Sequence, residues 1–249
     1  MFDAQQFAAR LANREDRWSL LTDFVAEWHT PLQEGDGYSV AELDVAEQHL
    51  GLKLPLALQE WYALAGRRED IIAPQNFLVS PPELEISEEN GLLIFHCENQ
   101  QVVEWGVQAD DLGLVDPPVW LDNSGLYDTQ QKLIQENNTL TEFALQMVVL
   151  ETRFNPVNEV FQALGWVTPQ TIGKAERNFV PLGFPDWHWP SYPTRFYGAD
   201  DLLIQVFGEE DPLLQVTARS LNAFEEAKTV LEVDWEPEKI YHEYDTFTR

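Results

Sequence analysis

Leu92 to Leu121, LLIFHCENQQVVEWGVQADDLGLVDPPVWL, is the stretch of this sequence that decides the fold. Two apolar runs, Leu92 to Cys97 and Val102 to Val107, flank the polar Glu98 to Gln101. That polar segment has the length of a hairpin connection, and a third apolar run, Val115 to Leu121, follows an acidic turn. We therefore predict a hairpin and a third strand here. The turn signal at 122–125 predicts a fourth strand at 126–131.

Helical patterns precede this stretch. Apolar residues recur at helical intervals through the first thirty residues, which predicts one or two amphipathic helices. Ser39 and Glu42 form a capping box, and the helix that they open runs to Leu50. Pro55 suits the first turn of a second helix, 56–65. Between this helix and the first strand, 67–91 has the composition of a loop with one short strand near 77–79.

A second capping-box candidate, Thr139 to Glu142, predicts a helix that runs to about Arg153. Proline and glycine then recur through 156–193, so we expect no long regular elements there. Aromatic residues crowd the same region, and we expect them to anchor it to a core rather than to form a recognition surface. A strand pair at 202–207 and 213–218 and a helix at 221–231 complete the chain. Strands that cluster, rather than alternate with helices, predict an α+β fold.

The composition bounds the function. With 15 basic and 43 acidic residues, the net charge is -28, which repels nucleic acids and anionic membranes and favours a basic partner. The alternative is that this charge serves only solubility. The single cysteine, Cys97, excludes an internal disulfide and a cysteine-rich metal site. We find neither a signal pattern nor a membrane-spanning apolar run, so we expect a cytoplasmic protein.

A search for enzyme motifs finds no phosphate-binding loop, dinucleotide fingerprint, nucleophile elbow or HExxH zinc helix. His96, beside Cys97 and Glu98, is the best candidate for a metal or Cys-His site. Neighbours on a strand point to opposite faces, however, so His96 and Cys97 are poorly placed to share a ligand. Adjacent acids such as Asp110-Asp111 leave a carboxylate-dependent glycoside hydrolase as a remaining alternative. We expect no enzyme activity, no cofactor and no metal.

The order of several short motifs resembles the SMI1/KNR4 family of the SUKH superfamily over roughly residues 39 to 150. The motifs are the capped helix, Leu52-Lys53-Leu54-Pro55, the Trp61 helix ending at Gly66, Phe95, Glu98-Asn99-Gln100, Trp105-Gly106-Val107, Asp116-Pro117-Pro118-Val119 and the Leu140-Thr141-Glu142-Phe143 helix. The sequence departs from the family pattern after Gly66, at Arg67 to Asp70. The resemblance implies an antiparallel or mixed sheet packed with several helices, and no catalysis.

Bacterial relatives in that family are immunity proteins that neutralise toxin domains, whereas fungal members are regulatory scaffolds. We assign a family-like domain to 1–153, including the N-terminal helices. The resemblance fades beyond residue 150, and from the sequence alone we expect a C-terminal extension at 154–249 that packs on the same core and adds a strand pair and a helix. We expect an immunity protein whose acidic surface binds a basic toxin domain, such as a nuclease. A scaffold that binds endogenous partners is the alternative.

Loop placement selects the candidate contact residues, because binding residues favour loops on a rigid scaffold. Carboxylates near the strand ends can stand in for the phosphates that a nuclease holds. Any one of these acids is also explained as an ordinary solvated side chain. The candidate partner-binding residues are Glu85, Glu88, Glu89, Asp110, Asp111, Asp116 and Asp122.

Overall fold

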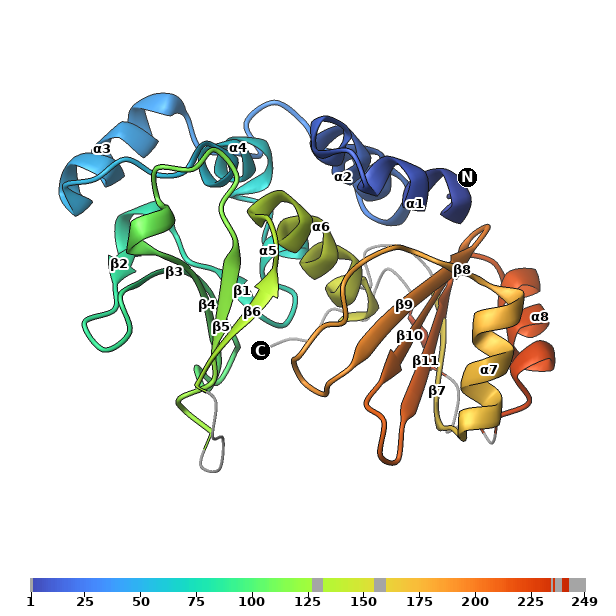
Figure 1. The fold of residues 1–249 in the computed structure, drawn as a ribbon. Coiled ribbons are helices and arrows are strands. Elements are labelled where there is room, and N and C mark those ends of the chain that lie inside the picture. The colour runs from blue at the N-terminus through green and yellow to red at the C-terminus, as the bar shows by residue number, and fades with distance from the viewer. Residues whose placement is uncertain (1, 127–131, 155–159, 234, 236–238, 242–249) are drawn as a thin grey trace. The chain divides into compact units, whose positions relative to one another are not determined.

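The computed structural model shows an α+β protein, as predicted (Figure 1). It describes residues 2–126, 132–154, 160–233, 235 and 239–241. The chain divides into two compact units, each with its own six-stranded antiparallel sheet. We call Leu32–Phe154 the inner unit, and Met1–Pro31 together with Asn155–Arg249 the outer unit.

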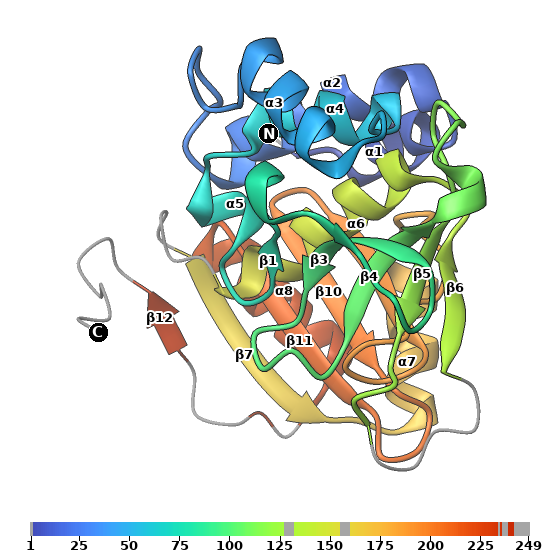
Figure 2. The same cartoon turned by 90° about the vertical axis from the view of Figure 1, so that its left-hand side faces the viewer.

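The inner unit contains the stretch Leu92 to Leu121. Its sheet has the order β1-β3-β4-β5-β6, with β2 also paired to β3, and Figure 2 shows β3 to β6 side by side. The helices are α3 (Val40–Leu50), α4 (Leu56–Ala65), α5 (Glu69–Ile72) and α6 (Leu140–Glu151), with short 3-10 turns η1 (Pro81–Glu83), η2 (Ala109–Asp111) and η3 (Thr152–Phe154). The strands are β1 (Phe77–Leu78), β2 (Glu85–Ile86), β3 (Leu92–Cys97), β4 (Glu104–Gln108), β5 (Val119–Asp122) and β6 (Leu133–Asn137).

Local signals explain how α3 and α4 begin and end. Ser39 and Glu42 make both halves of the predicted capping box, and Gly51, at a φ of 71°, ends α3 in the left-handed conformation that glycine tolerates best. The buried Glu47 carboxylate then fixes the extended link to α4. It accepts hydrogen bonds from Leu54 N at 2.9 Å and Gln59 Nε2 at 3.2 Å, and it pairs with the Lys53 ammonium.

The core of the inner unit is aromatic. Trp61 of α4, Phe95 of β3, Trp105 of β4 and Phe143 of α6 are each fully buried. Phe95 and Phe143 meet edge to face with ring centroids 5.4 Å apart, which is a favourable geometry for two rings. The helices α4 and α6 are therefore held against one face of the sheet by the residues that the apolar patterns placed in the core.

Strand positions in the inner unit are only partly as predicted. β3 and β4 confirm the hairpin, although its connection extends to Val103, whose carbonyl accepts a hydrogen bond from Glu98 N at 2.9 Å. The third strand begins at Val119, not at Val115, because two prolines precede it. The next described strand is β6 at Leu133–Asn137, whereas most of the strand predicted at 126–131 lies outside the described residues. The helix α5 and the strand β2 lie in the segment predicted as loop.

The outer unit has a second sheet with the order β12-β7-β11-β10-β9-β8. The predicted strand pair is confirmed as β10 and β11, but it belongs to this second sheet and does not lengthen the first. Figure 1 shows α7 and α8 on one face of the sheet, where Ala175 and Phe224 pack against Ile204 and Val216. The helices are α1 (Ala4–Leu11), α2 (Arg14–Trp28), α7 (Pro169–Asn178) and α8 (Leu221–Leu231). The strands are β7 (Val160–Trp166), β8 (Val180–Pro181), β9 (Thr194–Ala199), β10 (Leu202–Phe207), β11 (Leu213–Ala218) and β12 (Lys239–Tyr241).

The predicted boundary between 1–153 and 154–249 is wrong, because α1 and α2 belong to the outer unit. Gly198 of β9 explains why: a Cβ at this position would lie 3.0 Å from Leu182, 3.1 Å from Ala4 and 3.2 Å from Phe2. The N-terminal segment thus packs closely over a glycine of the second sheet. Arg219 adds an ionic link, since its Nη1 lies 2.5 Å from Glu27 of α2.

Regular elements also occur where proline and glycine predicted none. Thr168 caps α7 and Pro169 occupies its first turn, a position where proline costs no hydrogen bond, so the proline begins a helix instead of interrupting one. The expectation for the aromatic residues is largely met, because Trp187, Phe196 and Tyr197 are buried. Tyr192 is an exception, with 56% of its surface exposed.

Candidate protein-interaction surface

Five of the seven predicted contact acids lie on a connected part of the inner unit. Glu85 is exposed on β2, and Glu88 and Glu89 are exposed in the turn that leads to β3. Asp110 and Asp111 lie in η2, which follows β4. The backbone brings η2 beside the turn, because Ala109 N donates a hydrogen bond to the Gly91 carbonyl at 3.1 Å. Glu88, Glu89, Asp110 and Asp111 therefore gather at the end of the sheet where β3 begins, whereas Glu85, opposite Ile94, lies nearer to Glu104 and Cys97.

The other two predicted acids are committed to internal hydrogen bonds. Asp116 accepts from Thr141 N at 2.9 Å and from Thr141 Oγ1 at 2.6 Å, so its charge lies at the N-terminal turn of α6, where the helix dipole favours it. Asp122 is buried and accepts from Ser124 N at 2.8 Å, from Ser124 Oγ and from Asn90 Nδ2. Both carboxylates therefore stabilise the unit, and we leave them out of the contact surface.

Three exposed apolar side chains lie next to the acids, and the sequence analysis did not single them out. Leu114 is 49% exposed, Val115 is 55% exposed and Leu56, at the start of α4, is 45% exposed. Ala57 N donates to the Val115 carbonyl at 2.9 Å, which brings Leu56 beside the loop. The loop itself continues from η2, since Leu114 N donates to the Asp111 carbonyl at 2.9 Å.

We call the combined set the acidic–apolar surface. Its apolar part is a patch on a loop, flanked by carboxylates, and protein interfaces commonly combine an apolar centre with a polar rim. In the sequence, this patch is signalled by the apolar pair Leu114-Val115 between Asp111 and Asp116, but we assigned Val115 to the third predicted strand. The surface consists of Leu56, Glu85, Glu88, Glu89, Asp110, Asp111, Leu114 and Val115.

A row of polar side chains crosses the inner sheet at the other end of β3. Cys97, Glu104 and Asp122 are direct partners on β3, β4 and β5, so they share one face. Burial, followed by the carboxylates of Asp122 and Glu85, raises the pKa of Glu104. Burial, with Glu104 and Glu85, also raises the pKa of the Cys97 thiol to about 12. This thiol is therefore protonated near neutral pH and is a poor nucleophile.

His96 faces the opposite side of the sheet from Cys97, as the alternation of strand residues predicts. Its ring is fully buried and stacks on Trp61, with centroids 6.0 Å apart and planes 10° apart. Trp105 and Phe143 approach it at steep angles. Burial lowers the pKa of His96 to about 3, so the imidazole is neutral near pH 7. Neither ring nitrogen has a hydrogen-bond partner among the described residues.

These placements bear on metal and acid-base chemistry. Within the ranges that the structure describes, no three or more His, Cys, Asp or Glu side chains are grouped so that they would hold a metal ion. Among the described residues, Glu104 and Asp122 are two carboxylates on directly paired strand positions, and a glycosidase also uses two carboxylates. Asp122, however, is engaged by the donors of Ser124 and Asn90, which explains its position structurally.

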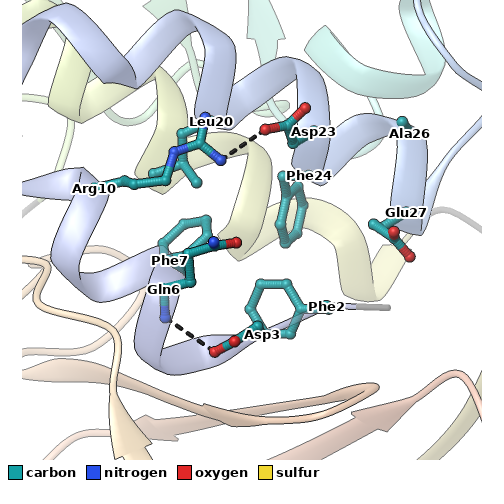
Figure 3. Close-up of a pocket in the computed structure, with 10 residues that line it drawn as sticks. All are labelled: Phe2, Asp3, Gln6, Phe7, Arg10, Leu20, Asp23, Phe24, Ala26 and Glu27. Carbon is teal, nitrogen blue, oxygen red and sulfur yellow. Dashed lines mark hydrogen bonds and ion pairs between the residues drawn. The ribbon is translucent and has the colours of Figure 1, made fainter.

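The described part of the chain has a surface hollow in each unit. The first, of about 240 Å³, lies between α1 and α2 of the outer unit, and Figure 3 shows the residues that line it. The second, of about 440 Å³, lies at the C-terminal end of α3 and is lined by Asp44, Glu47 and Lys53, among others. Because Glu47 and Lys53 hold the link from α3 to α4, the second hollow is explained by the fold.

Comparisons of the chain with protein families, with curated proteins and with solved structures find no match. Among the described helices, none is both long enough and apolar enough to cross a membrane. The evidence for function is therefore the surface chemistry of the chain itself.

Proposed function

We propose that this chain is a non-enzymatic interaction protein that binds a basic protein partner through the acidic–apolar surface. The observation that carries the proposal is the position of Leu114 and Val115, about half exposed, three and four residues after Asp111 of η2. Isolated apolar side chains on a surface are ordinary, so the support lies in the grouping of three of them, Leu56, Leu114 and Val115, next to exposed acids.

The two parts of the surface have different physical roles. The apolar side chains lose contact with water on binding, and we expect them to supply most of the affinity. The carboxylates attract a basic partner over longer distances, which raises the association rate and selects against acidic partners. The net charge of -28 supports the second role, because the whole chain adds to the attraction.

Within this class, we propose an immunity protein that occupies the basic surface of a toxin domain, such as a nuclease. The support is the resemblance to the SMI1/KNR4 family together with the charge, since a nuclease needs positive charge to hold phosphates. We place this encounter in the cytoplasm. A regulatory scaffold would use the same surface for an endogenous partner, so the identity of the partner distinguishes the two functions.

Co-expression with the products of adjacent genes tests the proposal. We expect one of them to be toxic, to form a stoichiometric complex with this chain and to lose its toxicity in that complex. A complex with a non-toxic endogenous protein would favour the scaffold. If no adjacent product binds and the chain protects cells from none of them, the immunity function is wrong.

Salt dependence tests the electrostatic role separately. We expect the association rate to fall markedly between low and high ionic strength, because salt screens the carboxylates. Asp110→Asn with Asp111→Asn should reduce that dependence, whereas Glu225→Gln with Glu226→Gln, two exposed acids of α8, should change it less. A rate independent of salt would assign the encounter to the apolar residues alone.

A further inference from the structure

The turn at 87–91, between β2 and β3, contains the dipeptide Asn90-Gly91. Asn90 is the one asparagine in the sequence that precedes a glycine. The backbone nitrogen after an asparagine can attack the carbon of the side-chain amide, and a glycine favours this attack because it has no side chain in the way. Asn90 therefore has the local chemistry of a site of spontaneous deamidation.

The folded structure holds both ends of the Asn90 amide. Oδ1 accepts a hydrogen bond from Leu92 N at 2.9 Å, and Nδ2 donates to Oδ2 of Asp122, on β5. The Asp122 side chain is buried, and its other oxygen accepts from Ser124 N at 2.8 Å. A carboxylate that is itself fixed on another strand thus fixes the orientation of the Asn90 side chain.

The nitrogen that would attack is held as well. Gly91 N donates a hydrogen bond to the Ser87 carbonyl at 2.9 Å, and the Gly91 carbonyl accepts one from Ala109 N at 3.1 Å. For the reaction, the Gly91 nitrogen must approach Cγ of Asn90. That approach breaks the bond to Ser87 and moves the Asn90 amide away from Asp122. Reaction therefore requires the turn to open locally.

We propose that Asn90 is a deamidation site that the Asp122 carboxylate keeps unreactive in the folded protein. When the turn opens, the Gly91 nitrogen forms a bond to Cγ of Asn90, the bond between Cγ and Nδ2 breaks, and ammonia leaves with the proton of the Gly91 nitrogen. Water then opens the resulting succinimide ring at either carbonyl and gives aspartate or isoaspartate. This site does not depend on the proposed partner of the acidic–apolar surface.

The product should not return to the original turn. A new carboxylate replaces the donor Nδ2 and faces Asp122, and two like charges at close range repel each other. Isoaspartate also lengthens the backbone between positions 90 and 91, which disturbs the hydrogen bond from Gly91 to Ser87. Deamidation would therefore act as a one-way change in the turn that carries Glu88 and Glu89.

Peptide mapping by mass spectrometry, after incubation at pH 7.5, measures deamidation at Asn90. We compare the folded protein with the same protein unfolded in guanidinium chloride. The folded protein should react at least about tenfold more slowly, because only the small population with an open turn reacts. Equal rates in the two states would overturn the proposal.

Three variants test the role of Asp122. Asp122→Ala removes the acceptor of Asn90 Nδ2, and deamidation of the folded protein should become roughly tenfold faster, the order given by a hydrogen bond to a charged group. Ser124→Ala removes only a hydroxyl that holds Asp122, and should accelerate the reaction roughly threefold. Glu47→Ala is the control, because it weakens the same unit at the link between α3 and α4. Its rate should stay within about twofold of wild type.

The three rates together decide between a local and a general cause. Acceleration in Glu47→Ala equal to that in Asp122→Ala would assign the reaction to unfolding of the whole unit and overturn the proposal. An unchanged rate in Ser124→Ala, which alters a single hydroxyl, would also overturn it, whether or not Asp122→Ala folds.

Discussion

Replacing His96 should remove a pH-dependent part of the stability of the inner unit. The ring is fully buried among Trp61, Trp105 and Phe143, and burial lowers its pKa from 6.5 to about 3. An unfolded chain takes up a proton near pH 6.5, whereas the folded chain resists protonation. The stability that the folded protein gains by keeping His96 neutral is therefore fully present above pH 6.5 and is lost as pH falls toward 3.

The expected size follows from the difference in pKa. Each pH unit below 6.5 costs about 1.4 kcal/mol, so folding should be weakened by about 2 kcal/mol at pH 5 compared with pH 7.5. His96→Phe keeps an aromatic ring but does not titrate. Its larger ring costs about 1–3 kcal/mol in a packed core, and that cost does not depend on pH.

Urea unfolding of wild-type protein and His96→Phe at pH 7.5, 6.5 and 5 measures this difference. Other titrating groups contribute equally to both proteins, so they cancel in the comparison. As pH falls from 7.5 to 5, we expect the free energy of unfolding of the variant to rise by about 2 kcal/mol relative to that of the wild type. Parallel stability curves would refute the reasoning. So would an NMR titration in which the His96 imidazole accepts a proton above about pH 5.

Three further variants test the packing of the inner unit by urea unfolding. Glu47→Ala should cost about 2–3 kcal/mol, because it leaves buried donors without their acceptor, whereas Gln48→Ala on the exposed side of α3 should change stability by less than about 0.5 kcal/mol. Gly37→Ala should cost more than about 3 kcal/mol, because the new Cβ would lie 1.8 Å from a backbone oxygen of α4. Gly113→Ala should be tolerated, because a Cβ there would have no atom within 4 Å. Equal losses of stability in the two variants would contradict this packing. Burial is the main cause that raises the pKa of Glu151 to about 8, so the free energy of unfolding of the wild-type protein should fall as pH rises from 4.5 to 8. Glu151→Gln does not titrate, and its stability relative to wild type should rise by about 1.4 kcal/mol per pH unit in that window. A difference that does not change with pH would refute this prediction.

The sequence predicted best those parts of the fold that local chemistry decides. Ser39 and Glu42 are three residues apart, and together they form a capping box without help from the rest of the chain. Thr139 likewise caps α6, since its hydroxyl accepts a hydrogen bond from Glu142 N at 3.4 Å. The hairpin of β3 and β4 also follows from neighbouring apolar runs and the polar connection between them.

Contacts distant in sequence explain most of the failures. Gly198 packs against Phe2 and Ala4, nearly two hundred positions earlier, and no periodicity reveals that pairing. The first two helices were therefore assigned to the wrong unit. Similarly, the start of β5 depended on Pro117 and Pro118, which we treated as part of an apolar run.

The candidate surface was also predicted correctly where local sequence decides the placement, and incorrectly where contacts distant in sequence decide it. Loop composition indicated where Glu88, Glu89 and Asp110 lie, and they are exposed. The same reasoning could not exclude Asp116, because its partner Thr141 is 25 residues away. It also missed the apolar patch, which forms only because α4 brings Leu56 to a loop almost sixty residues later.

The central claim, that the acidic–apolar surface binds a protein partner, is tested most directly by the dissociation constant of the complex with the interacting product of an adjacent gene. We predict that Leu114→Ser with Val115→Ser weakens the complex by at least about tenfold, as expected for central apolar contacts. Val45→Ser with Leu221→Ser, two comparably exposed apolar positions elsewhere, should leave it within about twofold. An unchanged dissociation constant for the first variant, or an equal loss in both, would contradict the claim.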